Sequence, residues 1–310
     1  MSSFAALGAL QLGFLYGLVA IAVLLSFRML NFPDLTVDGS FPLGAACCAA
    51  LVVAGANPWL ALLAGALAGA LAGLLTAFLS ERLKILNLLA GILSMTALYS
   101  INIRVMGRPN LPLLGHDTVV GSFTALGLGT PAAKLAVAAL LCLATGVLVG
   151  LFLASRYGLS LRAIGANPRM ASAVGVPAAQ RIYVGLALSN ALAGLSGALF
   201  AQLYGFADVS MGVGTIVIGL AAVILGEAFV RSWSPLAAVA ACVAGAIVYR
   251  FTISLALESE AIGLTTSDLN LISAVVVTAA FLFTKHSRRR HLKPKPEPKP
   301  EPARPPREAR

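Results

Sequence analysis

The sequence predicts an all-α polytopic membrane protein with about nine transmembrane helices, within a range of eight to ten. Its 310 residues are 59% hydrophobic and only 11% charged, and the mean hydropathy is +0.90, outside the range of ordinary soluble domains. The apolar blocks repeatedly reach or approach the roughly 20 residues that a bilayer-spanning helix needs. Glycines recur every four positions at Gly65, Gly69 and Gly73, which favours close helix approach. Together these observations indicate a tight helical bundle in a membrane.

The apolar blocks give the spans in chain order. The first block follows Met1-Ser2-Ser3, which lacks the basic residues of a signal peptide, and no small-residue cleavage site stands out after it, so we expect a retained span. The expected spans are 4–27, 40–56, 58–80, 86–106, 131–154, 181–204, 212–230, 234–256 and 268–284. The loop 107–130 is longer than a minimal connector, and its part 119–128 is either a re-entrant piece or the remnant of a tenth span.

Basic residues orient the spans. If the N-terminus is outside, one side of the membrane receives most of them, as the positive-inside rule requires for the cytoplasm. These are Arg28, Arg82, Lys84, Arg156, Arg162, Arg169, Arg181, Arg231 and the C-terminal tail. Only Arg104, Arg108 and Lys134 fall opposite.

The chain divides into a transmembrane domain at 1–284 and a Pro-rich basic tail at 285–310. The tail holds ten Lys and Arg against three Glu, whereas residues 1–284 hold twelve against nine acidic residues, so most of the formal charge of +10 belongs to the tail. Nucleic-acid binding would need a folded basic surface with base-reading side chains, which this stretch does not offer. We expect a solvated, polyproline-like tail that fixes the C-terminus in the cytoplasm.

An internal repeat accompanies this topology. The pattern D-x-S-x-x-x-G occurs at 38–44 and again at 208–214, each time opening an apolar run, and Pro58 and Pro235 begin the following spans. With the N-terminus outside, the first copy enters the membrane from inside and the second from outside. This arrangement predicts an inverted-topology repeat of the kind found in alternating-access transporters.

The motifs of an enzyme or a metal site are absent from the sequence. Two of its three histidines lie in the tail and His116 lies in a loop, and the chain has no HExxH, GxSxG or GxxxxGK[ST] motif. Cys47, Cys48, Cys142 and Cys242 lie in apolar runs without C-x-x-C spacing. We therefore expect no catalytic residue, no metal ligand and no cofactor on this chain, and ATP-driven work would require a separate subunit.

Polar residues in or beside the spans are candidates for a pathway lining, because lipid disfavours them unless they face the bundle interior or water. The candidates are Asn31, Asp34, Asp38, Asn87, Ser94, Asn102, Asn190, Gln202 and Glu227. Interhelical hydrogen bonding is the alternative for each residue taken singly. Pro33 should break the helix within the stretch 30–39, which is either an ordinary cytoplasmic turn or a broken helix at a binding cavity.

A polar island at 158–176 separates two apolar blocks. It contains the segment Arg162-Ala163-Ile164-Gly165-Ala166-Asn167 and reads as a short amphipathic helix at the cytoplasmic surface. Such a helix gains nothing from lipid, so we expect it to contact another protein.

Residues 162–167, followed by Ala171 and Gly175-Val176, resemble the coupling-helix loop of permeases in the branched-chain amino acid and ribose type of ATP-binding cassette importers. The runs 192–199, 210–214 and 221–226 resemble the same family, as does Leu30-Asn31-Phe32 after the first span, so the likeness covers roughly residues 10–284. Residues 205–212 and Gly226-Glu227 are most similar to the group associated with aromatic amino acid binding proteins. The chain departs from branched-chain relatives at Ala166, where they tend to carry an acidic residue.

The resemblance implies a set of partners in a bacterial inner membrane. These are a second permease copy, most simply in a homodimer, a pair of cytoplasmic ATPase subunits that bind ATP and Mg²⁺, and an external solute-binding protein that delivers a small solute such as an amino acid. It also implies that the coupling loop, 156–180, contacts the ATPase through Leu161, Arg162, Ala163, Ile164, Gly165, Asn167 and Arg169.

The chemistry of the coupling loop fits this role. Leu161, Ile164 and Val174 suit an apolar groove, Arg162 and Arg169 suit acidic groups, and a glycine permits close approach. Closure of the ATPase pair would then pull the two coupling helices together and rock the repeats. Two alternatives stay open: an ion-coupled secondary transporter or channel without an ATPase, and a membrane scaffold that transports nothing.

Overall fold

The computed structural model describes residues 3–125, 127–229, 234–258, 274–275 and 278, and the described chain is mostly helical. In chain order its helices and strands are α1 (Ser3–Val23), η1 (Leu24–Met29), α2 (Val37–Val53), α3 (Pro58–Glu81), α4 (Asn87–Met106), β1 (Asn110–Pro112), α5 (Val119–Thr124), α6 (Thr130–Ala154), α7 (Arg156–Ala166), α8 (Pro168–Ala173), α9 (Ala178–Tyr204), β2 (Phe206–Asp208), α10 (Thr215–Phe229) and α11 (Pro235–Glu258). The expected span 268–284 and the tail 285–310 lie outside the described residues.

Six helices of the described chain are long and apolar enough to cross a membrane. They cover the expected spans 4–27, 58–80, 86–106, 131–154, 181–204 and 234–256 with boundaries shifted by a few residues. The expected spans 40–56 and 212–230 correspond to shorter apolar helices, α2 and α10. The predicted total of about nine spans therefore stays a prediction.

The chain breaks where proline and glycine require it. The first span ends in the π-helical segment η1, and Asn31 then takes the left-handed conformation at φ 53° before the helix-free residues around Pro33. The predicted break in 30–39 is thus confirmed. At the other end of the molecule, α4 and α9 end at Gly107 and Gly205, whose positive φ values of 70° and 80° would strain a side chain.

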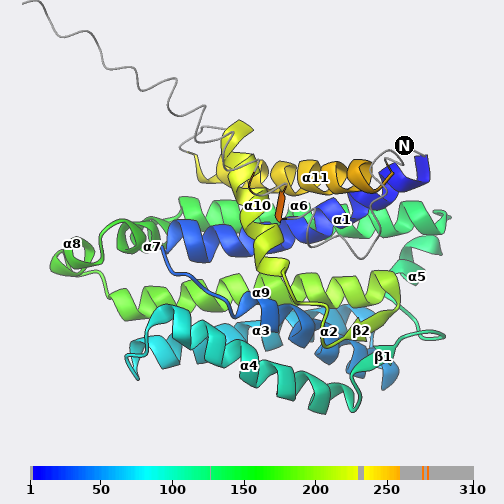
Figure 1. Ribbon diagram of the computed structural model, residues 1–310, viewed down its shortest axis with the longest axis horizontal. Helices are drawn as coiled ribbons and strands as arrows, with labels where there is room; N and C mark the ends of the chain where they lie inside the picture. The colour runs from blue at the N-terminus through cyan, green and yellow to red at the C-terminus, as the bar shows by residue number, and fades with distance from the viewer. Residues whose placement is uncertain (1–2, 126, 230–233, 259–273, 276–277, 279–310) are drawn as a thin grey trace, which may run out of the picture.

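The long helices form two layers that run parallel to the long axis of the molecule (Figure 1). One layer holds α1, α6 and α11, and the other holds α2, α3, α4 and α9. The helix α10 runs across α1 and α11 instead of along them, and its beginning reaches the second layer (Figure 1). Because α10 is short and crosses its neighbours, it does not display the simple antiparallel span that the predicted inverted repeat requires, and that repeat stays a prediction.

Close packing of α3 on α9 holds the second layer together. The glycine row of α3 faces the α9 backbone: a Cβ on Gly69 would overlap the carbonyl oxygen of Asn190, and one on Gly73 would overlap that of Leu186. The absence of side chains lets the two backbones touch, which confirms the close approach predicted from the four-residue glycine spacing.

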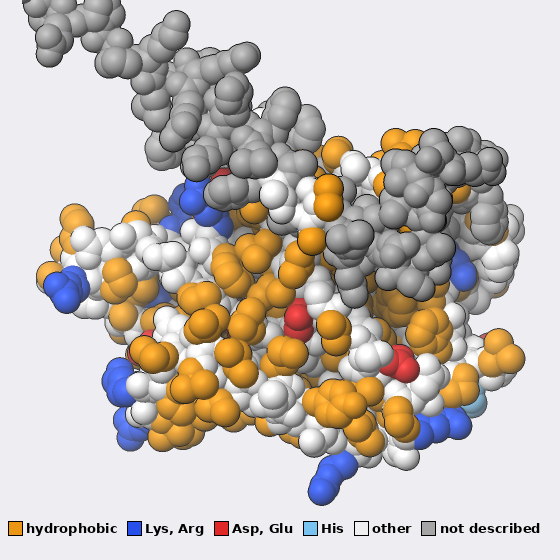
Figure 2. All heavy atoms as spheres, viewed as in Figure 1, with side chains coloured by type: hydrophobic (Ala, Val, Ile, Leu, Met, Phe, Trp, Pro, Cys, Tyr) orange, Lys and Arg blue, Asp and Glu red, His pale blue; other side chains and the backbone are white. Residues whose placement is uncertain are grey.

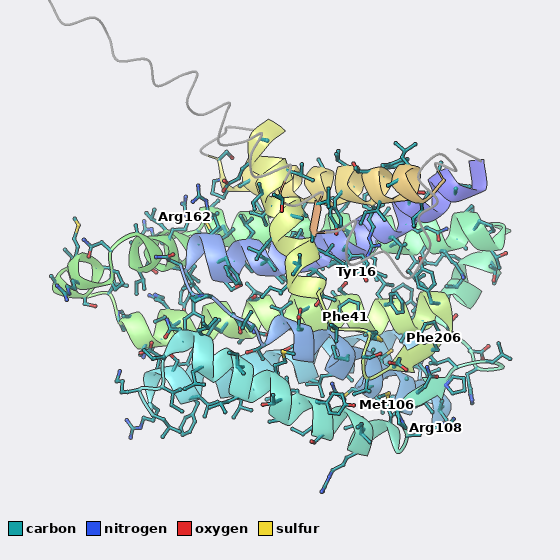
Figure 3. All side chains as sticks on the ribbon, in the orientation of Figure 1. Tyr16, Phe41, Met106, Arg108, Arg162 and Phe206 are labelled. Atoms are coloured by element: carbon teal, nitrogen blue, oxygen red, sulfur yellow. The ribbon has the colours of Figure 1, made fainter. Side chains whose placement is uncertain are left out.

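Aromatic rings fill the space between the layers. Tyr16 of α1 stacks on Phe41 of α2 with ring centroids 6.0 Å apart, and Phe41 meets Phe200 of α9 edge-on at 6.0 Å. The ring of Phe200 in turn contacts Phe206 of β2 at 5.7 Å. Figure 3 shows Tyr16 and Phe41 near the middle of the molecule and Phe206 nearer the β1–β2 end.

The two ends of the molecule differ. Helices α7 and α8 project from one end, and the N-terminus, α5 and the strands lie at the other (Figure 1). Strands β1 and β2 pair antiparallel with Asn110 opposite Asp208. In the described part of the segment expected as a re-entrant piece or a tenth span, the one helix is α5, whose six residues are about 9 Å long, too short to cross a bilayer.

Hydrophobic side chains cover much of the middle of the visible face, and most Lys and Arg side chains lie toward its edges (Figure 2). On α3, Leu60, Leu63, Leu67 and Leu71 are between 56% and 66% exposed, and α6 exposes Leu148 at 66%. Such exposure suits lipid contact, because hydrocarbon solvates leucine as well as a protein interior does.

Candidate functional site: a projecting helix pair and a buried polar network

The polar island folds into two short helices at one end of the molecule. The Ser155 hydroxyl accepts a hydrogen bond from the Gly158 amide at 3.3 Å and begins α7, and the Asn167 side chain accepts one from the Met170 amide at 3.1 Å and begins α8. Pro168 occupies the first turn of α8, where its missing N–H costs nothing. The sequence expected one amphipathic helix, and Asn167 divides it into two.

One face of α7 packs against the chain itself. Leu161 and Ile164 are 0% and 1% exposed, and Leu161 packs with Leu30 and Leu186. A side chain on Gly165 would overlap the carbonyl oxygen of Met29 in η1. The expectation that Leu161 and Ile164 dock into a partner's groove is therefore wrong for this structure, because both side chains are buried within this chain.

The opposite face of the helix pair is exposed and apolar. Leu159, Met170 and Val174 are 59%, 67% and 73% exposed, and Arg169 beside them is exposed. Such large apolar side chains at a projecting end, beside basic residues, are typical of a protein contact. From the expected coupling set, Ala163, Asn167 and Arg169 lie on exposed positions.

A pocket of ≈ 350 Å³ lies between α7 and η1. Its lining includes Arg28, Asn31, Arg162 and Gly165. Arg162 therefore lies at the contact between α7 and the first span, and Figure 3 shows it at the α7 end. The exposed Asn31, expected in a pathway, lies at this pocket.

An ion pair joins this region to α10. The Arg28 Nε and a Glu227 carboxylate oxygen are 2.5 Å apart, and the two side chains are 56% and 29% exposed. Glu227 was expected to line a pathway, and in the structure it links α10 to the end of the first span. The ion pair is thus a direct contact between η1 and α10.

A polar network occupies the centre of the second layer. The Asp34 carboxylate accepts a hydrogen bond from the Thr36 backbone N–H at 2.9 Å and one from the Asn190 side-chain nitrogen at 2.6 Å. The side-chain oxygen of Asn190 accepts one from the Ser40 hydroxyl at 2.7 Å. All four residues are fully buried. The network ties the broken stretch before α2 to α9, so Asp34 and Asn190, both pathway candidates, meet in one cluster.

Hydroxyl groups extend the network to α3 and α4. The Thr36 and Thr76 hydroxyls are 2.7 Å apart, and Thr76 donates to the Ser94 hydroxyl at 2.8 Å. Ser94, also a candidate, is thereby tied to the network, whereas the candidate Asn87 accepts from Ser80 at 2.7 Å away from it. Thr76 was not among the residues predicted from the sequence. It could have been found as a polar residue that follows the glycine row Gly65, Gly69 and Gly73 in an apolar span.

Gln202 lies apart from the other candidates. Its side-chain oxygen accepts from the Val119 amide at 2.8 Å and its nitrogen donates to the Pro58 carbonyl at 2.8 Å. It therefore holds α5 and the start of α3 against α9. The nine candidates thus do not form one continuous lining.

Asp38 joins the beginnings of α2 and α10. One carboxylate oxygen accepts from the Thr215 hydroxyl and from the Ile216 amide, both at 2.7 Å, and the other accepts from the Gly214 amide at 3.3 Å. This is an N-terminal cap supplied from a distant part of the chain. Thr215, a residue that sequence reasoning missed, completes it.

The second copy of the repeated pattern behaves differently. Asp208 accepts hydrogen bonds from the amide and hydroxyl of Ser210 and from Asn110. Partial burial raises the pKa of the Asp208 carboxyl, but these hydrogen bonds outweigh it and leave the pKa below its ordinary value. Asp38 thus bridges two helices, whereas Asp208 closes a local turn.

The sequence as a whole matches a known family. The profile described as the permease component of branched-chain amino acid transport systems matches residues 5–287. The chain belongs to this family. It is accordingly a transmembrane permease subunit of an ATP-binding cassette transporter.

Similar proteins agree with this assignment. The permease is 36% identical over 267 residues to the tyrosine transport system permease protein of Clostridioides difficile, covering 86% of each chain. It is 32% identical over 198 residues to the nucleoside ABC transporter permease protein NupC of Lactococcus lactis, covering 59% of each. Its fold is similar to a chain of PsaBC from Streptococcus pneumoniae, with a TM-score of 0.55, 15% identity, and coverage of 94% of this chain and 96% of that one.

Proposed function

We propose that this permease imports a small solute, an amino acid or a similar molecule, as the membrane subunit of an ATP-binding cassette importer in a bacterial inner membrane. Two copies would form the pathway, an ATPase pair would dock at the α7–α8 end, and an external binding protein would deliver solute at the β1–β2 end. ATP and Mg²⁺ would bind to the ATPase, and the C-terminus would lie in the cytoplasm. The amino acid class is supported by the tyrosine transport relative and its coverage of both chains.

The observation that carries this proposal is the two-faced helix pair. Its outer face presents Leu159, Met170 and Val174 for a partner, and its inner face is fixed to η1 through Leu161 and Gly165. A helix that is free outside and rigidly seated inside transmits a push from a partner into the first span. Neither the ion-coupled transporter nor the scaffold explains both faces.

The contacts supply a route for that push. In the proposed mechanism, ATPase closure moves α7, the Gly165 contact moves η1, and the Arg28–Glu227 ion pair moves α10. Asp38 then carries the movement from α10 to α2. The helix contacts support rocking of an inverted repeat. In the proposed repeat α1, α2 and α3 correspond to α9, α10 and α11; α2 and α3 pack on α9 of the other half, and α10 and α11 pack on α1.

The docking surface is tested by replacing Met170 and Val174 with Asp. Both side chains are exposed, so the variant should insert and fold, while charge in an apolar contact should abolish copurification of the ATPase and solute uptake. Leu114→Asp is the control for ATPase copurification, because Leu114 is 90% exposed just after β1, away from α7 and α8, and should leave copurification unchanged. Normal copurification and uptake in the Met170 and Val174 double variant would refute the assignment of this surface.

A further inference from the structure

A second cavity lies within the membrane-spanning part of the molecule. It has a volume of ≈ 350 Å³ and three walls: the beginning of α2, the middle of α4, and the segment between β2 and α10. This volume lies at the lower end of the range for small-molecule sites. The α2 wall includes Asp38, the α4 wall includes Tyr99 and Asn102, and the third wall includes Val213.

The Asn102 side chain on this wall has a buried acceptor without a donor. Asn102 is 0% exposed, and its amide nitrogen donates to the Gly39 carbonyl at 3.4 Å. Its Oδ1 atom is buried and, among the described residues, has no hydrogen-bond partner. Buried acceptors are nearly always paired in folded proteins, so this atom calls for a donor beyond the described residues, such as a bound solute.

The neighbouring charge specifies the kind of donor. The Asp38 carboxylate receives three hydrogen bonds, two on Oδ1 and one on Oδ2, which leaves Oδ2 with one acceptor position. The residues that line this cavity in the described chain include no Lys, Arg or His. An incoming cation with several N–H donors therefore fits better than an anion.

The remaining walls suit an apolar group. Pro42 and Met95 line the cavity together with the Tyr99 ring and Val213, and the last two side chains are 53% and 72% exposed. The non-helical backbone before α10 forms part of this wall, and at membrane depth such backbone is tolerated where it is buried in protein or lines a water-filled cavity. The cavity is thus polar at one side and apolar at the other.

We propose that this cavity is a solute-binding site of the permease that holds the ammonium group of a free apolar or aromatic amino acid against Asn102 Oδ1 and Asp38. The proposal rests on the proposed import function for its setting, and on the cavity and the unpaired acceptor for its chemistry. The amino acid side chain lies between Met95, Tyr99 and Val213.

The test measures protection of a cysteine placed in the cavity wall. Val213→Cys is introduced into the purified full-length permease, and its alkylation rate is read by mass spectrometry of its own peptide, so the four native cysteines stay in place. The probes are L-tyrosine, L-leucine, tyramine, which lacks a carboxylate, and 3-(4-hydroxyphenyl)propionate, which lacks an amine. Leu114→Cys is the control for reagent effects, because Leu114 is 90% exposed and does not line this cavity.

We expect L-tyrosine, L-leucine and tyramine to slow alkylation of Val213→Cys, the propionate to leave it unchanged, and Leu114→Cys to respond to none of them. Asn102→Leu should weaken protection by L-tyrosine about tenfold or more, as expected for loss of a hydrogen bond to a charged group. If Asn102→Leu fails to elute as a folded protein, Tyr99→Ala replaces it, and it should weaken protection by L-tyrosine more than by L-leucine.

Two results would overturn the proposal: no protection by any amine, or equal protection by the propionate and tyramine. Because the measurement needs neither the ATPase nor the binding protein, it separates this site from the import function. Uptake by the complete wild-type transporter without cysteine protection would refute the site alone. Protection without ATPase association or uptake would refute the import function alone.

Discussion

Replacement of Asn190 by Leu tests whether the buried network stabilises the junction of α2 and α9. Asn190 donates to Asp34 at 2.6 Å and to the Leu186 carbonyl at 3.0 Å, and it accepts from Ser40 at 2.7 Å. Leucine has a similar size but replaces none of these bonds. Asp34 would then keep its hydrogen bonds with the backbone amide and the side chain of Thr36.

The expected loss of unfolding free energy in Asn190→Leu follows from these three hydrogen bonds. The bond from Ser40 joins α2 to α9 and contributes about 0.6 kcal/mol, the average measured between membrane helices. The bond to the Leu186 carbonyl lies within α9 and contributes about 0.5–1 kcal/mol. The bond to the Asp34 carboxylate contributes about 1.5–3 kcal/mol if its charge is retained. The Asn190→Leu variant should therefore lose about 3–4 kcal/mol of unfolding free energy.

Asp34→Asn provides the comparison. It removes the charge at nearly constant shape, and rotation of the Asn190 amide restores a hydrogen bond between the two side chains. Asp34→Asn should cost less than about 1.5 kcal/mol, and Asn190→Leu should cost less in the Asp34→Asn background than alone. Unfolding by SDS in mixed micelles, followed by circular dichroism, measures all four proteins. Equal costs for Asn190→Leu in both backgrounds would refute the charge-based reasoning.

Three further predictions concern the coupling route and helix packing. Gly165→Leu should lower uptake severalfold and reduce thermal stability, because its side chain needs the space of the neighbouring carbonyl, whereas Gly121→Leu, which has open space, should change neither quantity. Arg28→Glu and Glu227→Arg should each reduce uptake, and the double exchange should recover most of it if the ion pair transmits movement; recovery of stability without uptake would contradict that role. Gly69→Leu should prevent stable insertion, since α3 would separate from α9, and normal yield of folded protein would contradict the packing described.

Most of the fold could be predicted from the sequence because hydrophobic length is a strong signal in membranes. The blocks that became α3, α4 and α6 were located within a few residues, and Pro33 marked the break before α2. The crossing of α10 could not be predicted, because its 15 residues have the same apolar composition as a span. Its direction depends on the contact between Asp38 and the start of α10, which joins residues more than 170 positions apart.

The candidate site was predictable in its location but not in its contacts. The polar island gave the position of α7 and α8, yet apolar residues on a short helix face either a partner or the chain itself, and periodicity does not distinguish the two. Leu161 was therefore expected to face a partner, but its side chain is buried within the chain. Likewise Glu227 stood out as an acid in an apolar run, but its partner Arg28 lies about 200 residues earlier and gave no local signal.

The glycine contacts between α3 and α9 also limit how the permease can move. Because carbonyl groups of α9 sit where side chains of α3 would otherwise be, sliding by one residue would bring a Cβ atom of α3 onto the α9 backbone. Shear between these helices is therefore blocked, and the pair must turn as one rigid body. Any hinge therefore lies outside this pair, where the other helices meet it.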